Sequence, residues 1–94
     1  MLLFCEYVIS DMHRVAFSEW RTAHAARWRD AELLENTSQP GVFVEIRRPS
    51  SAEEAARMEK ERREGRSWEE MEQWVKGGRE GVRIWLFRPV ELNG

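Results

Sequence analysis

Three charged residues in apolar segments, Glu6, Glu45 and Arg83, have the types needed for acid–base chemistry. A carboxylate whose pKa is raised in a closed site acts as a base, and a guanidinium binds an anionic or enol oxygen. We therefore treat all three as candidate catalytic residues. His24, between two tryptophans, is a candidate proton donor. The alternative is that Glu6, Glu45 and Arg83 form a polar network in a dimer seam.

Four further residues are candidate ligand-binding residues. Tyr7 would offer a hydroxyl to a pocket, and Asn36 and Trp85 would help to seat an aromatic ligand. Phe43 is the fourth. The single cysteine, Cys5, lies in the middle of an apolar run, where a free thiol most often acts as a small packed hydrophobe.

No motif for a metal or cofactor is present. His13 and His24 are eleven residues apart, so on a helix about 16 Å would separate them, too far to share a metal. CxxC, GxGxxG, P-loop and HExxH patterns are absent from the sequence. We therefore expect no metal site and no cofactor.

The length and composition predict one small globular domain over residues 1–94, with 41% hydrophobic and 34% charged residues. The net charge of −2 argues against nucleic acid as a partner, and no apolar run has the length of a membrane span. The apolar start carries Glu6 and lacks a basic segment, unlike a signal peptide. With one cysteine, these features predict a reducing cytoplasm.

The hydrophobic periods predict six main elements in the order β-α-β-β-α-β, and one additional short helix. The strands are expected over 2–9, 32–37, 42–47 and 82–87, and the helices over 12–28 and 51–65, with a short third helix over 67–77. Ser51 with Glu54 and Ser67 with Glu70 have the spacing of capping boxes. The mixed charges of "RMEKERREGR", residues 57–66, indicate a solvated helix face.

This order predicts a ferredoxin-like α+β fold, a four-stranded antiparallel sheet of order 4-1-3-2 with both helices on one face. Alternation then divides the strand residues between two faces. The residues expected under the helices are Val42, Val44, Ile46, Val82, Ile84 and Leu86. Those expected on the opposite face are Phe43, Glu45, Arg47, Arg83, Trp85 and Phe87. The first strand adds either Phe4, Glu6 and Val8 or Leu3, Cys5 and Tyr7, and the first set is favoured because it keeps Glu6 out of the core.

The aromatic residues on this second face predict a homodimer, in which a second copy of the sheet covers them. The chain thereby resembles the dimeric α/β-barrel superfamily, which includes antibiotic-biosynthesis and haem-degrading monooxygenases. The resemblance covers the whole chain and rests on topology. It implies ligands bound between sheet and helices or within the barrel. The haem-degrading members use an Asn, a Trp and a His at positions that this sequence does not match, so haem degradation is not expected.

Two hypotheses for function follow. The first is a cofactor-independent monooxygenase-like enzyme acting on a small aromatic or enolisable substrate. The second is a non-catalytic dimeric module that binds a small hydrophobic or aromatic ligand, or that serves only as a stable assembly. A closed pocket that reaches Glu6, Glu45, Arg83 or His24 would favour the enzyme.

Overall fold

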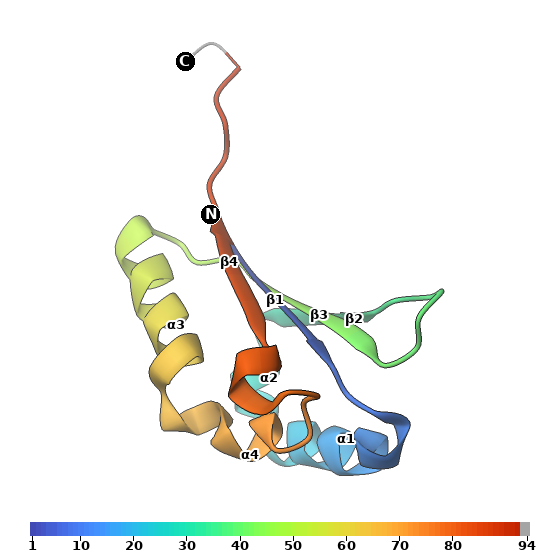
Figure 1. Ribbon diagram of the computed structural model, residues 1–94. Coiled ribbons are helices and arrows are strands. Elements are labelled where there is room, and N and C mark those ends of the chain that lie inside the picture. Colours follow the sequence, from blue (N-terminus) through green and yellow to red (C-terminus); the bar gives the residue numbers. More distant parts are fainter. Residues whose placement is uncertain (93–94) are drawn as a thin grey trace.

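The computed structural model describes residues 1–92, which form an open four-stranded antiparallel sheet with helices against one face (Figure 1). The strands are β1 (Leu2–Val8), β2 (Ala31–Glu35), β3 (Val42–Arg47) and β4 (Arg83–Phe87). The α-helices are α1 (Arg14–Ala23), α2 (Ala25–Trp28), α3 (Ala52–Glu64) and α4 (Glu69–Glu72), and short 3-10 helices cover Asp11–His13, Arg66–Trp68 and Gly78–Gly81. The architecture is α+β and is compatible with a ferredoxin-like fold.

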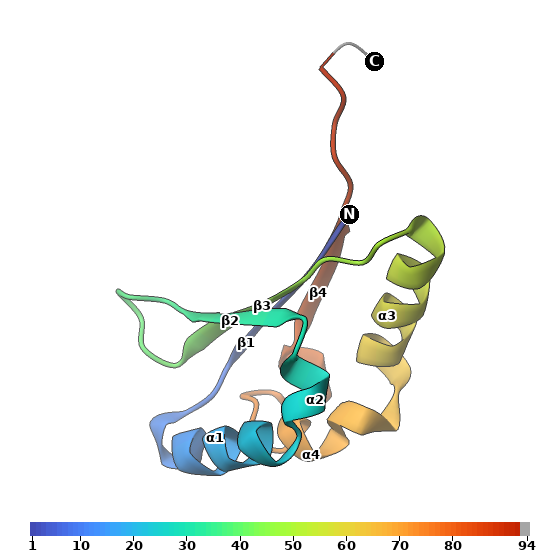
Figure 2. The ribbon, with the colours of Figure 1, turned by 180° about the vertical axis from the view of Figure 1, so that it is seen from behind.

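The strand order is β2-β3-β1-β4, which is 4-1-3-2 when it is counted from the other edge. β1 lies in the centre and pairs antiparallel with β3 and β4, and β2 pairs antiparallel with β3. Figures 1 and 2 show α1, α2 and α3 on the same side of the sheet, so no helix of residues 1–92 covers the opposite side, which we call the bare side. No helix within residues 1–92 is both long enough and apolar enough to cross a membrane.

The helix expected over residues 12–28 is interrupted at His24. This residue has φ −117° and ψ 37°, outside helical values, so α1 ends at Ala23 and α2 begins at Ala25. The interruption turns the chain so that Trp28 reaches the core. The helical period of the sequence continues through this point, which is why the break was not predicted.

Of the two expected capping boxes, only the first caps a helix. The Ser51 hydroxyl oxygen accepts a 3.1 Å hydrogen bond from the backbone N–H of Glu54, at the start of α3. Ser67 instead lies inside the 3-10 turn Arg66–Trp68 and makes no cap. A capping residue needs extended backbone just before the helix, and Ser67 does not have this position.

The turn between β2 and β3 contains Gly41 with φ +94°, as its Pro-Gly sequence predicts. Its carbonyl oxygen accepts a hydrogen bond from the backbone N–H of Ile9 at 2.8 Å. A Cβ atom at this position would lie 2.8 Å from the Ile9 carbonyl oxygen, so a side chain here would collide with the backbone as well as strain it. Glycine therefore fixes the hairpin against the end of β1.

The predicted facing is correct for β1 and β4 and wrong for β3. Phe43 and Glu45 are buried under the helices, whereas the half-buried Val42, Val44 and Ile46 point to the bare side. The pairing with β1 decides this, because Cys5 lies opposite Glu45 and Tyr7 opposite Phe43, and paired residues share a face. A shift of one residue in the pairing register moves every side chain of a strand to the other face. The hydrophobicity of the two faces of β3, taken alone, predicted the wrong one.

Most of the tryptophans pack in the core on the helix side of the sheet. Trp20, Trp28 and Trp68 are buried there, Trp74 packs against them, and their rings meet largely edge to face. The other core residues are Leu3, Cys5, Tyr7, Ile9, Phe17, Phe43, Met71, Val75 and Ile84. Trp85, by contrast, is 41% exposed on the bare side.

Candidate functional site

A buried carboxylate, Glu45, lies at the centre of the helix-covered face and has no solvent exposure. It accepts hydrogen bonds from the Tyr7 hydroxyl at 2.9 Å and from Arg47 Nε at 3.0 Å. Arg62 donates two more, from Nε at 3.1 Å and from Nη2 at 3.2 Å. We call Tyr7, Glu45, Arg47 and Arg62 the buried network. Its carboxylate oxygens are well supplied with donors, as a buried charge requires.

Three elements position these side chains. Tyr7 comes from the central strand β1, and Glu45 and Arg47 come from β3, two residues apart and therefore on one face. Arg62 comes from α3, whose helical period places Ala55, Met58 and Arg62 on the side facing the sheet. The side chain of Arg62 is only 1% exposed.

The network holds Glu45 in its charged form. Burial alone would raise the pKa of Glu45, but the charges and hydrogen bonds of Arg62 and Arg47 outweigh burial and lower it. Burial likewise acts to lower the pKa of Arg62, and Glu45 more than reverses this. Burial and the Glu45 charge raise the pKa of Tyr7 well above its ordinary value, and that of Cys5 to about 12. Tyr7 and Cys5 are therefore neutral.

Aromatic rings enclose the two arginines. The Arg62 guanidinium carbon lies 4.2 Å from the centre of the Trp68 ring, and that of Arg47 lies 5.0 Å from the same ring. Arg47 also lies 5.5 Å from the Trp28 ring. Such cation–π contacts stabilise a guanidinium that is withdrawn from water.

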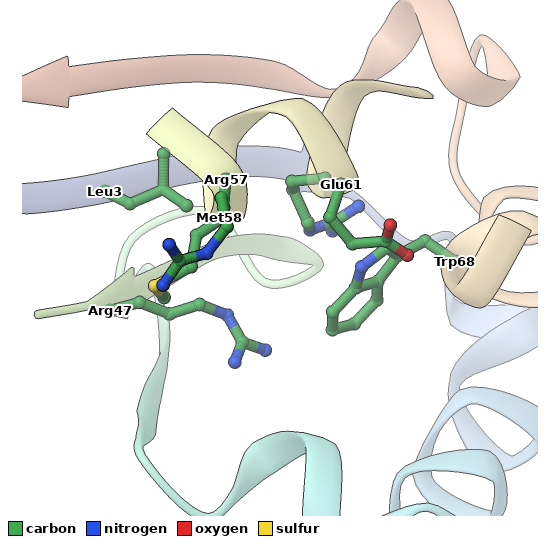
Figure 3. Close-up of a pocket in the computed structure, with 7 residues that line it drawn as sticks. Leu3, Arg47, Arg57, Met58, Glu61 and Trp68 are labelled. Carbon is green, nitrogen blue, oxygen red and sulfur yellow. The ribbon is translucent and has the colours of Figure 1, made fainter. Parts of the chain in front are cut away.

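Beside the network, a pocket of about 290 Å³ opens between the sheet and α3 (Figure 3). Its walls are Leu3, Met58 and Trp68 together with Arg47, Arg57, Glu61 and Arg62. Figure 3 shows Arg47, Arg57 and Met58 on one side of the pocket, with Glu61 and Trp68 on the other. A second, more polar pocket of about 530 Å³ shares Arg47 and Met58 with the first.

Two guanidinium nitrogen atoms of the network have no acceptor within the described residues. Nη2 of Arg47 and Nη1 of Arg62 are buried and find no hydrogen-bond partner within residues 1–92. Both residues line the first pocket. Buried polar groups are nearly always paired, so each unpaired group requires an explanation.

The structure does not bring the three candidate catalytic residues together. Glu6 and Arg83 face the bare side of the sheet, where their charged atoms are 4.0 Å apart. Glu45 points to the opposite side, and its pKa is lowered, whereas a raised pKa was expected. The reversed facing of β3 accounts for the separation. The partners expected for Glu45 were Arg83 or Arg47, and it is Arg47, with Arg62, that binds it.

Some of the predicted residues do share a surface hollow of about 480 Å³ at the end of the sheet. Glu6, Tyr7, Asn36 and Arg83 all line it, beside residues 76–81. The Tyr7 hydroxyl, however, is directed to Glu45. The Asn36 side-chain oxygen accepts hydrogen bonds from the backbone N–H groups of Ser38 and Gln39, which stabilises the hairpin turn.

The remaining predicted residues lie apart from this hollow. His24 is half-buried at the end of α1, with Nδ1 2.9 Å from the Trp20 carbonyl oxygen and its ring 5.0 Å from the Trp20 ring. Phe43 is a core residue between Tyr7 and Phe17. Trp85 packs on Phe4 on the bare side.

Three site residues were not predicted from the sequence: Arg62, Trp68 and Met58. Arg62 lies within the charged run 57–66, which was predicted to be a solvated face, and for Arg62 that prediction is wrong. A signal was present: Arg62 follows Ala55 and Met58 at helical spacing, so it continues the thin apolar stripe of α3. An arginine at that position needs a buried partner, and Glu45 is the buried acid that supplies it.

Among the described residues, histidine, cysteine and acidic side chains do not gather in any group of three that would hold a metal ion. Comparison of the chain with protein-family models, curated proteins and solved structures found no match.

Proposed function

We propose that this protein is a homodimeric module that binds a small ligand and does not catalyse a reaction. One observation carries the ligand-binding part: an apolar-walled pocket lies directly beside a buried charged network. Small-molecule sites are typically concave and mostly apolar, with a few fixed polar groups that orient the ligand. The pocket of about 290 Å³ suits a ligand of one or two rings.

The state of Glu45 favours binding over catalysis. A general base needs a pKa near the working pH and a free approach to its substrate. Glu45 has a lowered pKa, and Tyr7, Arg47 and Arg62 surround its oxygens. The network is therefore suited to holding charge in a fixed position. The monooxygenase hypothesis requires a carboxylate with a raised pKa, whereas the pKa of Glu45 is lowered.

The homodimer is proposed from the bare face of the sheet. We call this the outer face; its apolar members are Leu2, Phe4, Val8, Leu34, Val42, Val44, Ile46, Trp85 and Phe87. Apolar patches spanning a whole sheet are rarely left in water. A second copy of the same face is the proposed occupant, because the Glu6–Arg83 pair gives each copy both signs of charge for a two-fold contact. The chain would then assemble as in the dimeric α/β-barrel superfamily that its element order resembles.

The free thiol of Cys5 is fully buried and has no disulfide partner in the chain. This is compatible with the reducing cytoplasm that we propose as the location of the protein.

Nuclear magnetic resonance with a named probe tests the ligand-binding function. Phenylacetate is titrated into the protein, and the Met58 methyl and Trp68 indole resonances are expected to shift. The Trp85 indole on the outer face is expected to stay in place. Shifts at Trp85 without shifts at Met58 and Trp68 would contradict a pocket under α3.

A pair of matched variants sharpens this test. Glu61 lines the pocket and Glu64 does not, although both are exposed on α3. Glu61→Trp is expected to fill the mouth of the pocket and to abolish the shifts. Glu64→Trp makes the same chemical change outside the pocket and is expected to leave them intact.

A further inference from the structure

The pocket under α3 contains an excess of positive charge at its buried end. Arg47 and Arg62 carry two guanidinium charges, and Glu45 supplies one carboxylate, so the buried network has a net charge of +1. Tyr7 and Cys5 are neutral and do not change this sum. At the mouth, Arg57 and Glu61 add one charge of each sign.

The unpaired donors lie on the same two arginines. Nη2 of Arg47 and Nη1 of Arg62 are the network atoms that no residue of 1–92 accepts from. Leaving such groups unpaired in a protein interior is costly, and an ionised acceptor is the strongest partner for a guanidinium. A carboxylate is planar and has two acceptor oxygens, so it matches a pair of N–H donors better than a single neutral carbonyl does.

The other walls are apolar and aromatic. Leu3, Met58 and Trp68 form them, and Trp68 presents an indole ring beside both arginines. A ligand that filled the pocket would therefore place its charged group at the arginines and a flat apolar body against these three side chains.

We propose that the pocket binds a small monocarboxylate with an aromatic or apolar body, whose carboxylate accepts hydrogen bonds from Arg47 Nη2 and Arg62 Nη1. This inference rests on the ligand-binding function proposed above and names its ligand class. Both nitrogen atoms are shielded from solvent, so the acid reaches them only when part of the pocket wall moves. Met58 is the flexible, half-buried part of that wall, so its side chain moves first.

The test compares phenylacetate with phenylacetamide, two probes of nearly the same shape that differ in charge. Binding is followed by calorimetry and by the Met58 methyl and Trp68 indole resonances. Met12, which is 83% exposed and does not line the pocket, gives an internal control resonance. We expect phenylacetate to bind at least about ten-fold more tightly than the amide, because a charged acceptor strengthens each hydrogen bond.

Variants identify which charges produce that preference. Arg47→Gln is expected to reduce the preference for the acid to about three-fold or less. Arg29→Gln is the control: it makes the same change at an exposed arginine outside the pocket and is expected to keep the preference. Glu61→Gln removes the acidic group at the mouth, so phenylacetate should bind about two-fold more tightly with no change for phenylacetamide.

A further variant covers the case in which Arg47→Gln does not fold. Arg57 is exposed, lines the pocket and forms no salt bridge within residues 1–92, so Arg57→Gln should fold normally. It is expected to weaken phenylacetate binding about two-fold and to leave the amide unchanged.

The outcomes separate the two proposals. Equal binding of acid and amide at Met58 and Trp68 would overturn the carboxylate inference and leave the ligand-binding function in place. A preference for the acid that survives both Arg47→Gln and Arg57→Gln would also overturn it. If neither probe shifts Met58 or Trp68 at millimolar concentration, both proposals are wrong.

Discussion

Each face of the sheet contains an exception to the usual relation between polarity and burial. The helix-covered face contains Glu45 and Arg62, both buried, whereas the outer face carries Val42, Val44 and Ile46 beside solvent. On the covered face the charges satisfy one another through hydrogen bonds between β3 and α3. On the outer face, no helix of residues 1–92 covers the apolar residues.

The roles proposed above for the two faces follow from this difference. A buried ion pair contributes little net stability, because desolvation offsets its attraction, but it fixes the position of the groups around it. An apolar face stabilises the protein only when another surface covers it and removes it from water. The covered face is therefore suited to a fixed binding site, and the outer face to association.

The largest expected effect is at the covered face. Glu45→Gln leaves Arg62 charged and buried without its partner, so the free energy of unfolding should fall by about 3–5 kcal/mol. Urea denaturation measures this. Glu32→Gln on β2 breaks an exposed ion pair with Arg48, the residue after β3. It is the matched control and should change stability by less than about 1 kcal/mol. Equal losses in the two variants would show that the buried network contributes no more to stability than an exposed ion pair.

The pH dependence follows from the same carboxylate. The pKa of Glu45 is lower in the folded protein than its ordinary value of 4.5, so the folded state prefers the charged form. Its contribution is fully present above about pH 4.5 and is lost as the pH falls through the lowered pKa. Glu35, whose pKa is lowered to about 2 by hydrogen bonds from Arg14 and the Gly41 N–H, adds to this loss. Denaturation curves between pH 7 and pH 2 should therefore show a steeper loss for the native chain than for Glu45→Gln.

On the outer face, the main expected effect is on association. Trp85→Ala removes a large aromatic side chain from the proposed contact and should weaken the dimer about 30-fold or more. Sedimentation equilibrium measures the dissociation constant of the dimer. Met12→Ala, at an apolar residue that is exposed away from the sheet, should leave it unchanged. A native chain that is monomeric at micromolar concentration would contradict the dimer itself.

A smaller effect is expected at Tyr7. Tyr7→Phe keeps the ring between its aromatic neighbours and removes only the hydroxyl that donates to Glu45. The free energy of unfolding should fall by about 1.5 kcal/mol, the low end of the usual range for a hydrogen bond to a charged group. Since Arg47 and Arg62 still hold the carboxylate, the loss should be clearly smaller than for Glu45→Gln. Thermal unfolding followed by circular dichroism distinguishes the two.

The smallest effect is expected at the charged pair of the outer face. Arg83→Gln breaks an ion pair whose atoms are 4.0 Å apart and whose arginine is 70% exposed. Such pairs contribute less than about 1 kcal/mol. A loss as large as that of Tyr7→Phe, measured by urea denaturation of the dimer, would show that the pair is desolvated in the dimer contact.

The elements themselves could be predicted because their signals are local. Alternating apolar residues predicted β3 with its bounds, Ser51 with Glu54 marked the start of α3, and Pro-Gly marked the hairpin turn. The break at His24 was not predictable, because the helical period continues through it and no helix-ending residue marks it.

The candidate site was less predictable, because it depends on the pairing of residues far apart in the chain. Tyr7, Glu45 and Arg47 were all noticed, but Glu45 and Arg47 were assigned to the wrong face. Arg62 was assigned to solvent because its neighbours in sequence are charged. Its helical spacing from Ala55 and Met58 pointed to the sheet, and its ion pair with Glu45 shows that it is buried there.

By itself, the sequence determined the kinds of element, their order and the turns that join them, because these depend on neighbouring residues and on hydrophobic period. The tertiary structure decided which way β3 faces, and with it which charges are buried and which apolar residues remain open. The physical reason is that a strand with two moderately apolar faces has no strong preference of its own. The register of β1 with β3, and the arginine that α3 brings to Glu45, make the choice.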